Sequence, residues 1–261
     1  MRRNMRLLAA AGIIVALGAA NTACGSGSDG GLATSSTVSE SGVDHSVIIA
    51  RHGESWTNIA AQPAGAVDPA TANMPVPISN PADFLGPTGD LPLSEAGAKQ
   101  AEEMAASLAG EVDEIYASAQ VRTFQTARAV SIANGEPVHA TWDLREISTD
   151  RSLEPQWLKG EALDTPVGAE NDRQSFNQMN ATFLNFWNQF VDDHKGEEGT
   201  SLIVTHGGVM RMFVAPLCNN AKLTLGFIAA HPIGNTQQIK ATLHPDGSVT
   251  CTEWVGEDIT P

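Results

Sequence analysis

The residues most able to do chemistry first gather in the stretch SVIIARHGESWTNI, residues 46–59. An apolar run over 46–50 has the length of a buried strand and ends abruptly in Arg51, His52 and a glycine. Two cationic side chains at one strand tip repel each other and gain nothing from burial. The arrangement makes sense where an anion binds, so the stretch predicts an anion site.

Three further residues of this kind follow other predicted strands. Arg122 comes shortly after the strand DEIYAS, Glu146 follows the extended segment ATWDLR, and His206 follows the strand SLIVT. Taken singly, each has an ordinary explanation as a solvated or helix-capping residue. Ligands of open α/β sheets bind beyond the carboxyl ends of the strands, so the joint pattern favours one site shared with the Arg-His pair.

The elements that must position these residues alternate between strands and helices. Apolar residues recur at helical spacing over 94–110, 120–135 and 173–194. In the last of these ranges the apolar residues include an aromatic stripe, which is typical of a core. HPDG at 244–247 predicts a hairpin turn near the end of the chain. The repetition predicts an α/β fold, a three-layer sandwich with a mostly parallel central sheet and helices on both faces.

The N-terminal region reads as a targeting segment followed by a tether. MRRNMR is a short basic region, and the apolar stretch over 7–20 is too short to span a bilayer comfortably. We expect a signal peptide at 1–23, a flexible Gly/Ser-rich tether at 24–44, and one folded domain at 45–261. The mature domain is therefore expected to be exported.

Cys24 is the candidate attachment point to a membrane. It follows small residues and precedes the tether, which resembles a bacterial lipoprotein lipobox with Cys24 lipidated. The sequence departs from that pattern at Asn21, where such boxes usually carry an aliphatic residue. The alternatives are an outward-facing protein anchored in the cell membrane by lipid, and secretion after cleavage near Ala20 or Ala23.

The remaining two cysteines, Cys218 and Cys251, allow two interpretations. In an oxidising compartment they can form a disulfide, but two separate buried thiols fit the sequence equally well. No spacing of cysteine or histidine is typical of a metal site.

The charge balance narrows the possible partners. Fifteen Lys and Arg stand against 30 Asp and Glu, which gives a formal net charge of −15. Nucleic acids and anionic membrane surfaces both require a basic face, so neither is expected to bind, and membrane contact is limited to the lipid anchor. A small anionic substrate remains compatible with a locally positive pocket.

The motifs together resemble the histidine phosphatase superfamily, in its phosphoglycerate mutase-like branch. RHGESWTN matches the Arg-His-Gly-Glu-Ser/Thr-x-x-Asn signature. Four more blocks follow in the order of that branch: DLPLSEAGAKQA, YASAQVRTFQTA, LREI and VTHGG. The resemblance covers about residues 45–250.

The resemblance implies a role for each matching residue. His52 is the expected nucleophile and forms a phosphohistidine, while Arg51 and Arg122 bind phosphate oxygens through planar guanidinium forks. His206 is expected to donate to the phosphoryl group as an imidazolium. Glu146 resembles the general acid that protonates the leaving alkoxide, with an ordinary ion pair to Arg145 or Arg151 as the alternative.

The same resemblance implies two secondary contacts and a set of absences. Asn58 is expected to hydrogen-bond near the phosphate, and Gly207 to lie beside it, whereas Glu54 and Ser55 anchor the loop. No metal or other cofactor is implied. Five histidines lie outside the motifs and are expected at the surface or in turns: His45, His139, His194, His231 and His244.

Two segments depart from the family pattern. Residues 60–89, rich in proline, alanine and glycine, are longer than the usual connection and predict a long loop or lid. Residues 147–172 form a second insertion, directly after Glu146. Both follow catalytic segments and are expected to influence specificity.

The expected activity is hydrolysis of a small phosphomonoester outside the cytoplasm. A phosphoglycerate-type mutase is the alternative within enzymes, and a non-catalytic lipoprotein that binds a phosphorylated ligand is the alternative outside them. The receptor alternative predicts the loss of a catalytic group, and all five are present in this sequence.

Overall fold

The computed structural model describes residues 42–56, 58, 90–147, 152–157, 159–168, 173–218 and 220–261. The predicted signal peptide, Cys24 and the insertion at 60–89 lie outside the described residues. No helix within these described ranges is long and apolar enough to cross a membrane.

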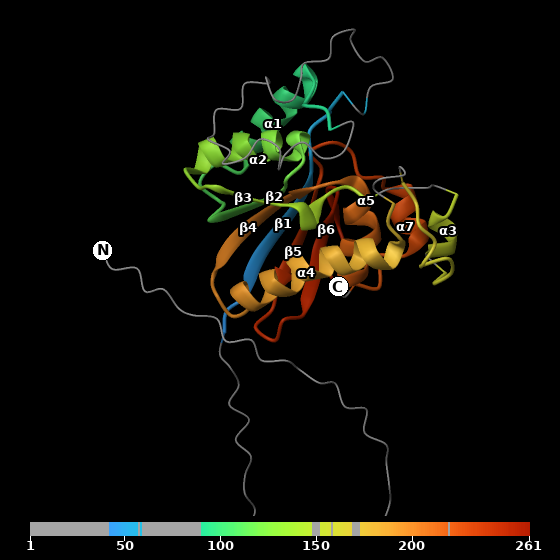
Figure 1. The fold of residues 1–261 in the computed structure, drawn as a ribbon. Coiled ribbons are helices and arrows are strands. Elements are labelled where there is room, and N and C mark those ends of the chain that lie inside the picture. Colours follow the sequence, from blue (N-terminus) through green and yellow to red (C-terminus); the bar gives the residue numbers. More distant parts are fainter. Residues whose placement is uncertain are drawn as a thin grey trace, which may run out of the picture. The chain divides into compact units, whose positions relative to one another are not determined.

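A central sheet organises the described residues (Figure 1). Its seven strands follow the order β3-β2-β4-β1-β5-β6-β7. The first four in that order are mutually parallel, and the last three continue the sheet in antiparallel fashion. In chain order the strands are β1 (His45–Arg51), β2 (Glu114–Ser118), β3 (Val138–Thr141), β4 (Gly199–Thr205), β5 (Gln238–Leu243), β6 (Val249–Trp254) and β7 (Glu257–Asp258). The predicted α/β fold with a parallel sheet core is confirmed.

Strand β1 shows why a continuous apolar run becomes a central strand. It pairs with β4 on one side and with β5 on the other, so its backbone donors and acceptors are used in both directions. Val47 and Ile49 point into one hydrophobic core, and Ile48 and Ala50 point into a second core on the opposite face. A strand buried on both faces needs no polar alternation.

Helices cover both faces of the sheet, as predicted. Figure 1 shows α1 (Glu95–Ser107) and α2 (Val121–Asn134) on one side and α4 (Phe176–His194) on the other. The face of α4 also receives a continuous run of short helical elements that begins directly after β4: α5 (Gly207–Val209), η3 (Met210–Val214, a π-helix) and α6 (Ala215–Leu217). The result is a three-layer sandwich.

Local signals account for the ends of these helices. Ser94 caps α1 by accepting a hydrogen bond from the backbone of Gly97, and Gly135 ends α2 in the left-handed region with φ of +79°. Ser175 begins α4 with a capping box completed by Gln178. The aromatic stripe of α4 is buried, as the sequence predicts.

Some elements differ from the sequence prediction. The segment 137–147 is extended only in β3, after which a short 3-10 helix, η2 (Trp142–Leu144), turns the chain. Residues 147–172 are not wholly irregular, since they contain α3 (Glu154–Trp157), and α7 (Leu225–Ala230) was not predicted. Helices this short carry too few residues to show a 3.6-residue period.

Two histidines predicted at the surface or in turns are buried, which corrects that expectation. His45, at the start of β1, contacts the hydroxyl of Ser201 at 2.9 Å, and His194, at the end of α4, contacts Glu114 at 2.8 Å. His45 is 4% exposed and His194 is 5% exposed. Both rings lie at the amino ends of the strands, away from the edge where the candidate catalytic residues gather.

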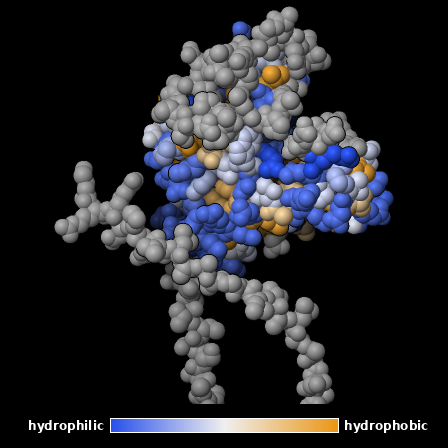
Figure 2. Space-filling view, in the orientation of Figure 1, coloured by the Kyte–Doolittle hydropathy of each residue, from blue (hydrophilic) through white to orange (hydrophobic). Residues whose placement is uncertain are grey.

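The surface of the described residues offers little apolar area. Figure 2 shows a face that is mainly hydrophilic, with small apolar areas scattered over it. The large hydrophobic side chains exposed among the described residues are Val43, Ile132 and Leu225, which lie before β1, on α2 and on α7 respectively. Scattered single residues of this kind do not form a docking surface.

A disulfide joins Cys218, just after α6, to Cys251 in β6. The Cα atoms are 5.2 Å apart and the two residues are separated by 33 positions in the sequence. The sequence left open a disulfide or two separate thiols, and the structure contains the disulfide. The bond ties the helical segment that follows β4 to the antiparallel part of the sheet.

We expect loss of this disulfide to lower the free energy of unfolding by about 4 kcal/mol, because the cross-link restricts the unfolded chain. Urea unfolding of the wild type with and without reductant, beside the double variant Cys218→Ala/Cys251→Ala, measures the effect. The double variant should be insensitive to reductant. Equal unfolding free energies for oxidised and reduced wild type would contradict the expectation.

Candidate active site

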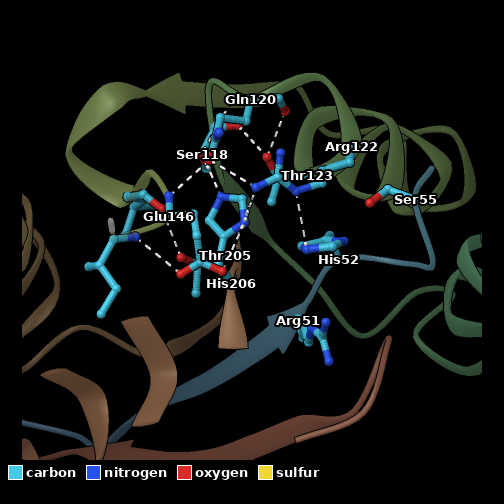
Figure 3. Close-up of polar contacts among 12 residues, drawn as sticks. Arg51, His52, Ser55, Ser118, Gln120, Arg122, Thr123, Glu146, Thr205 and His206 are labelled. Atoms are coloured by element: carbon cyan, nitrogen blue, oxygen red, sulfur yellow. Dashed lines mark hydrogen bonds and ion pairs between the residues drawn. The ribbon is translucent and has the colours of Figure 1, made fainter. Parts of the chain in front are cut away.

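The carboxyl ends of the parallel strands bring the sequence-predicted residues together (Figure 3). Arg51 ends β1 and His52 follows it, while His206 follows β4 and its ring centroid lies 5.2 Å from that of His52. Arg122, in the first turn of α2, lies between the two imidazoles, and Glu146 approaches His206 from the segment after η2. Residues separated by up to 155 positions in the sequence therefore share one site.

His52 is held with a defined nitrogen facing the site. Its Nδ1 lies 2.7 Å from the backbone oxygen of Gly53, which can only accept, so Nδ1 carries the proton. Its Nε2 then has a free lone pair, which accepts a hydrogen bond from Nε of Arg122 at 3.2 Å. Burial, reinforced by the charge of Arg122, lowers the pKa of His52 to about 3. The ring is therefore neutral and potentially nucleophilic at neutral pH.

Arg122 is the hub of the polar network in Figure 3. Its guanidinium contacts His52, His206 at Nδ1 (3.2 Å) and the side-chain oxygen of Gln120 (3.4 Å). It also forms an ion pair of 2.9 Å with Asp90, and both side chains are almost fully buried. Asp90 accepts a second hydrogen bond from the backbone of Val121 at the start of α2. Asp90 thus fixes the position of the guanidinium.

His206 has a polar partner at each ring nitrogen. Nη2 of Arg122 can only donate, so Nδ1 of His206 accepts, and its Nε2 donates to Ser118 Oγ at 3.0 Å. Burial first, then the charge of Arg122, holds the pKa of His206 well below its usual value. The free site therefore favours the neutral ring, and the imidazolium expected opposite a bound phosphoryl group stays a prediction.

Glu146 lies near the same nitrogen of His206 that Arg122 contacts. Its Oε2 is 4.0 Å from Nδ1 of His206, and its backbone N–H donates to Gln120 at 2.8 Å. Burial raises the pKa of Glu146, against the opposing charges of Arg122 and Arg51. Arg145, one of the two alternative partners, donates instead to Gln174, and Arg151 lies outside the described residues. The effect of burial favours the protonated carboxyl, which is the form a general acid requires.

The second of the two glycines after His206 allows Glu146 to approach closely. A Cβ at Gly208 would lie 2.4 Å from Oε1 of Glu146 and 2.8 Å from the side chain of Ile147. At Gly207 a Cβ would meet only the Arg51 side chain, at an ordinary 3.5 Å. Gly208 is therefore the position where only glycine leaves room for the acid.

Arg51 lies apart from the Arg122 network and faces a cavity. One terminal nitrogen donates to the backbone oxygen of Ile233 at 2.8 Å, while its buried Nε has no hydrogen-bond partner. The side chain lines a cavity of about 490 Å³ together with Glu146 and Gly207. That volume lies within the range of small-molecule pockets, roughly 300–1,000 Å³. A buried donor without a partner beside such a cavity fits an anionic ligand.

The loop after His52 is anchored as the sequence predicts for Glu54. Its carboxylate accepts a hydrogen bond from the hydroxyl of Ser94 at 2.7 Å. Asn58 closes a turn, because its side-chain oxygen accepts from both the backbone and the hydroxyl of Ser55 at 3.0 Å. The described contacts of Asn58 are thus with its own loop, and a contact with phosphate stays a prediction.

The sequence analysis gave no role to four residues that shape the site: Asp90, Ser118, Gln120 and Gly208. Each lies inside a block quoted for the family resemblance, so the motif itself was the available signal. Each also has a contact in the site with a residue 26 to 88 positions away, which no local pattern encodes. Among the described residues, no group of three or more His, Cys, Asp or Glu could hold a metal ion.

Comparison with known proteins identifies the same family that the sequence motifs resemble. The sequence profile of the histidine phosphatase superfamily (branch 1) matches residues 47–254. No curated protein matches the chain.

Solved structures with a similar fold include three phosphatases. A mycobacterial glucosyl-3-phosphoglycerate phosphatase with bound VO3 is 19% identical, covers 81% of this chain and 99% of its own, and has a TM-score of 0.55. The phosphoserine phosphatase of Entamoeba histolytica with 3-phosphoglyceric acid is 19% identical over 82% of this chain and 98% of its own, with a TM-score of 0.53. A putative α-ribazole-5′-P phosphatase from Escherichia coli is 15% identical over 83% and 98%, with a TM-score of 0.55.

Proposed function

This chain belongs to the histidine phosphatase superfamily (branch 1), and on that basis we propose that it hydrolyses small phosphomonoesters through a phosphohistidine on His52. The observation that carries the proposal is the state of His52, a neutral imidazole whose Nε2 lone pair faces the buried guanidinium of Arg122. The phosphatase titles of the similar structures support the same chemistry.

The first half of the reaction transfers the phosphoryl group to the enzyme. Nε2 of His52 attacks phosphorus, and Arg122 exchanges its contact with that nitrogen for the phosphoryl oxygens. The Nε donor of Arg51 supplies a further contact. Glu146 gives its proton to the leaving oxygen as the phosphorus–oxygen bond breaks.

The second half returns the enzyme to its starting state. The Glu146 carboxylate removes a proton from a water molecule, whose oxygen attacks phosphorus while the phosphorus–nitrogen bond to His52 breaks. The dianionic phosphoryl group adds negative charge beside the ring, so it raises the pKa of His206 and strengthens donation from its ring. His206 thus becomes charged only when there is charge to stabilise.

The location outside the cytoplasm is part of the proposal. The disulfide between Cys218 and Cys251 supports it, since such bonds persist in oxidising compartments. The targeting segment with Cys24 supports attachment to the outer side of the cell membrane, with secretion as the alternative. Labelling with radioactive palmitate, in wild type and in Cys24→Ser, tests the anchor.

The activity itself is tested by phosphate release. The folded domain, in the presence of EDTA, is given aryl and alkyl phosphomonoesters, with isomerisation of 3-phosphoglycerate measured in parallel. We expect phosphate release that EDTA leaves unchanged, because the described site contains no metal-binding group. Isomerisation without release would instead favour the mutase, and inactivity with tight phosphate binding would favour a receptor.

Gly208→Ala is expected to lower kcat for alkyl phosphates by about 10²-fold, because the added methyl group displaces the Glu146 carboxyl from its position. Gly226→Ala, at a helical glycine where a Cβ would meet only the hydroxyl of Thr224 at an ordinary 3.9 Å, is the matched control. Steady-state kinetics of both variants checks the expectation. Wild-type turnover by Gly208→Ala would show that the acid does not depend on this close contact.

A further inference from the structure

The cavity beside the catalytic residues carries a second arginine that the proposed reaction does not use. Arg211 lies in the π-helix η3, five positions after His206, and lines the same cavity as Arg51 and Glu146. Its Nη2 donates to Oε1 of Glu154 at 2.7 Å. The Arg211 side chain is 40% exposed and that of Glu154 is 19% exposed, so the pair faces the cavity without being buried.

Arg211 is electrostatically part of the site. Burial raises the pKa of Glu146, and Arg211 is close enough to oppose that rise, with Arg122 and Arg51. It likewise lowers the pKa of Arg51, after the larger effect of burial. The rest of the cavity wall is largely apolar, including Ile228, Pro232 and Ile233. Beyond Arg51 and Glu146, a leaving group in this cavity therefore meets one further cationic group, Arg211.

We propose that Arg211 binds a second anionic group, a carboxylate or a further phosphate, on the leaving-group part of the substrate. In the free enzyme the guanidinium of Arg211 is paired with Glu154, and the substrate anion displaces the Glu154 carboxylate. The inference rests on the proposed phosphatase function and names its substrate class. It also suggests how the insertion at 147–172 influences specificity, because α3, within that insertion, places Glu154 at the cavity wall.

The chemistry of the exchange favours an anion. A guanidinium presents a planar fork that binds carboxylate or phosphate through two parallel hydrogen bonds. Replacing Glu154 by a substrate anion keeps the charge-assisted bonds of Arg211 and releases a carboxylate that is already partly solvated. The cost of opening the pair is small, because partly exposed ion pairs contribute little to stability.

A purely structural ion pair, which only anchors α3, predicts a different result for one variant. If Glu154 competes with the substrate, Glu154→Gln improves the use of anionic substrates. If the pair serves only to hold α3 in place, the same change impairs all substrates and lowers stability. The two roles therefore change activity in opposite directions.

The experiment uses pairs of phosphomonoesters that differ in one anionic group. 3-Phosphoglycerate against glycerol 3-phosphate tests a carboxylate, and fructose 1,6-bisphosphate against fructose 6-phosphate tests a second phosphate. In one of the two pairs, we expect wild type to prefer the compound that carries the additional anionic group. Arg211→Gln should reduce that preference, as a ratio of kcat/KM, by about tenfold and mainly through KM, which corresponds to about 1.4 kcal/mol. Glu154→Gln should increase it.

Lys240→Gln is the matched control, because it breaks a similarly short ion pair, 2.8 Å to Glu253, whose residues do not line the cavity. A preference that Arg211→Gln leaves within twofold in both pairs would overturn the inference, as would a general loss in Glu154→Gln. If wild type released no phosphate from any compound, the proposed function would fail and this inference with it. Phosphate release with the same kcat/KM whether or not the substrate carries the second anionic group would overturn this inference alone.

Discussion

Replacing His52 with alanine is expected to lower phosphate release on the order of 10⁴- to 10⁶-fold, because the reaction then lacks its nucleophile. His52 is 2% exposed, and its ring is hydrogen-bonded to Gly53 and Arg122, so the site holds this imidazole in a fixed position. Steady-state kinetics with an aryl phosphate gives the widest measurable range.

The control must separate chemistry from folding. His52→Gln keeps a polar side chain beside Arg122 and should be as inactive as His52→Ala, with circular dichroism and the unfolding midpoint near those of wild type. His139→Ala, at an exposed histidine on β3, should retain full activity. Turnover by both His52 variants within about tenfold of wild type would refute the assignment of the nucleophile.

Replacing Glu146 with glutamine is expected to slow alkyl phosphates about 10²- to 10⁴-fold but aryl phosphates less than about tenfold. An alkoxide needs a proton as it leaves, whereas a phenolate with a low pKa departs without one. The comparison of the two substrate classes thus reports the acid directly. Equal losses for both classes would argue against Glu146 as the acid and favour a structural role.

The pH dependence gives the same variant a second readout. Burial raises the pKa of Glu146, so the carboxyl keeps its proton to a higher pH than an ordinary glutamate and loses it as the pH rises further. Turnover of alkyl phosphates should therefore fall on the alkaline side of that raised pKa. Glu146→Gln should lack this fall, because glutamine does not titrate. Glu253→Gln, outside the site, should show the wild-type profile.

Much of the architecture could be predicted from the sequence, because its central elements carry strong local signals. The apolar run of β1 and the aromatic spacing of α4 each fit one kind of element and not the other. Glycine and serine also mark helix ends, as at Ser94 and Gly135. These features depend on neighbouring residues, which a sequence displays.

What could not be predicted depends on partners far along the chain. His194 is buried with its Nε2 against the carboxylate of Glu114, which lies 80 positions earlier in the sequence. Nothing in the sequence near either residue indicates this contact. The lowered pKa of His206 likewise follows from burial and from the charge of Arg122, 84 positions away. Motif positions located the site, but the charge states within it required the three-dimensional arrangement.

The most direct test of the central claim is to trap the phosphorylated enzyme. The protein is mixed with a phosphomonoester, quenched in base during turnover, where a phosphorus–nitrogen bond survives, and digested for peptide mass spectrometry. The account predicts one phosphoryl group on the imidazole of His52, absent from His52→Gln and more abundant in Glu146→Gln with an aryl phosphate, because that variant activates water poorly. Phosphate release with a phosphoryl group on another residue, or with none on the protein, would contradict it.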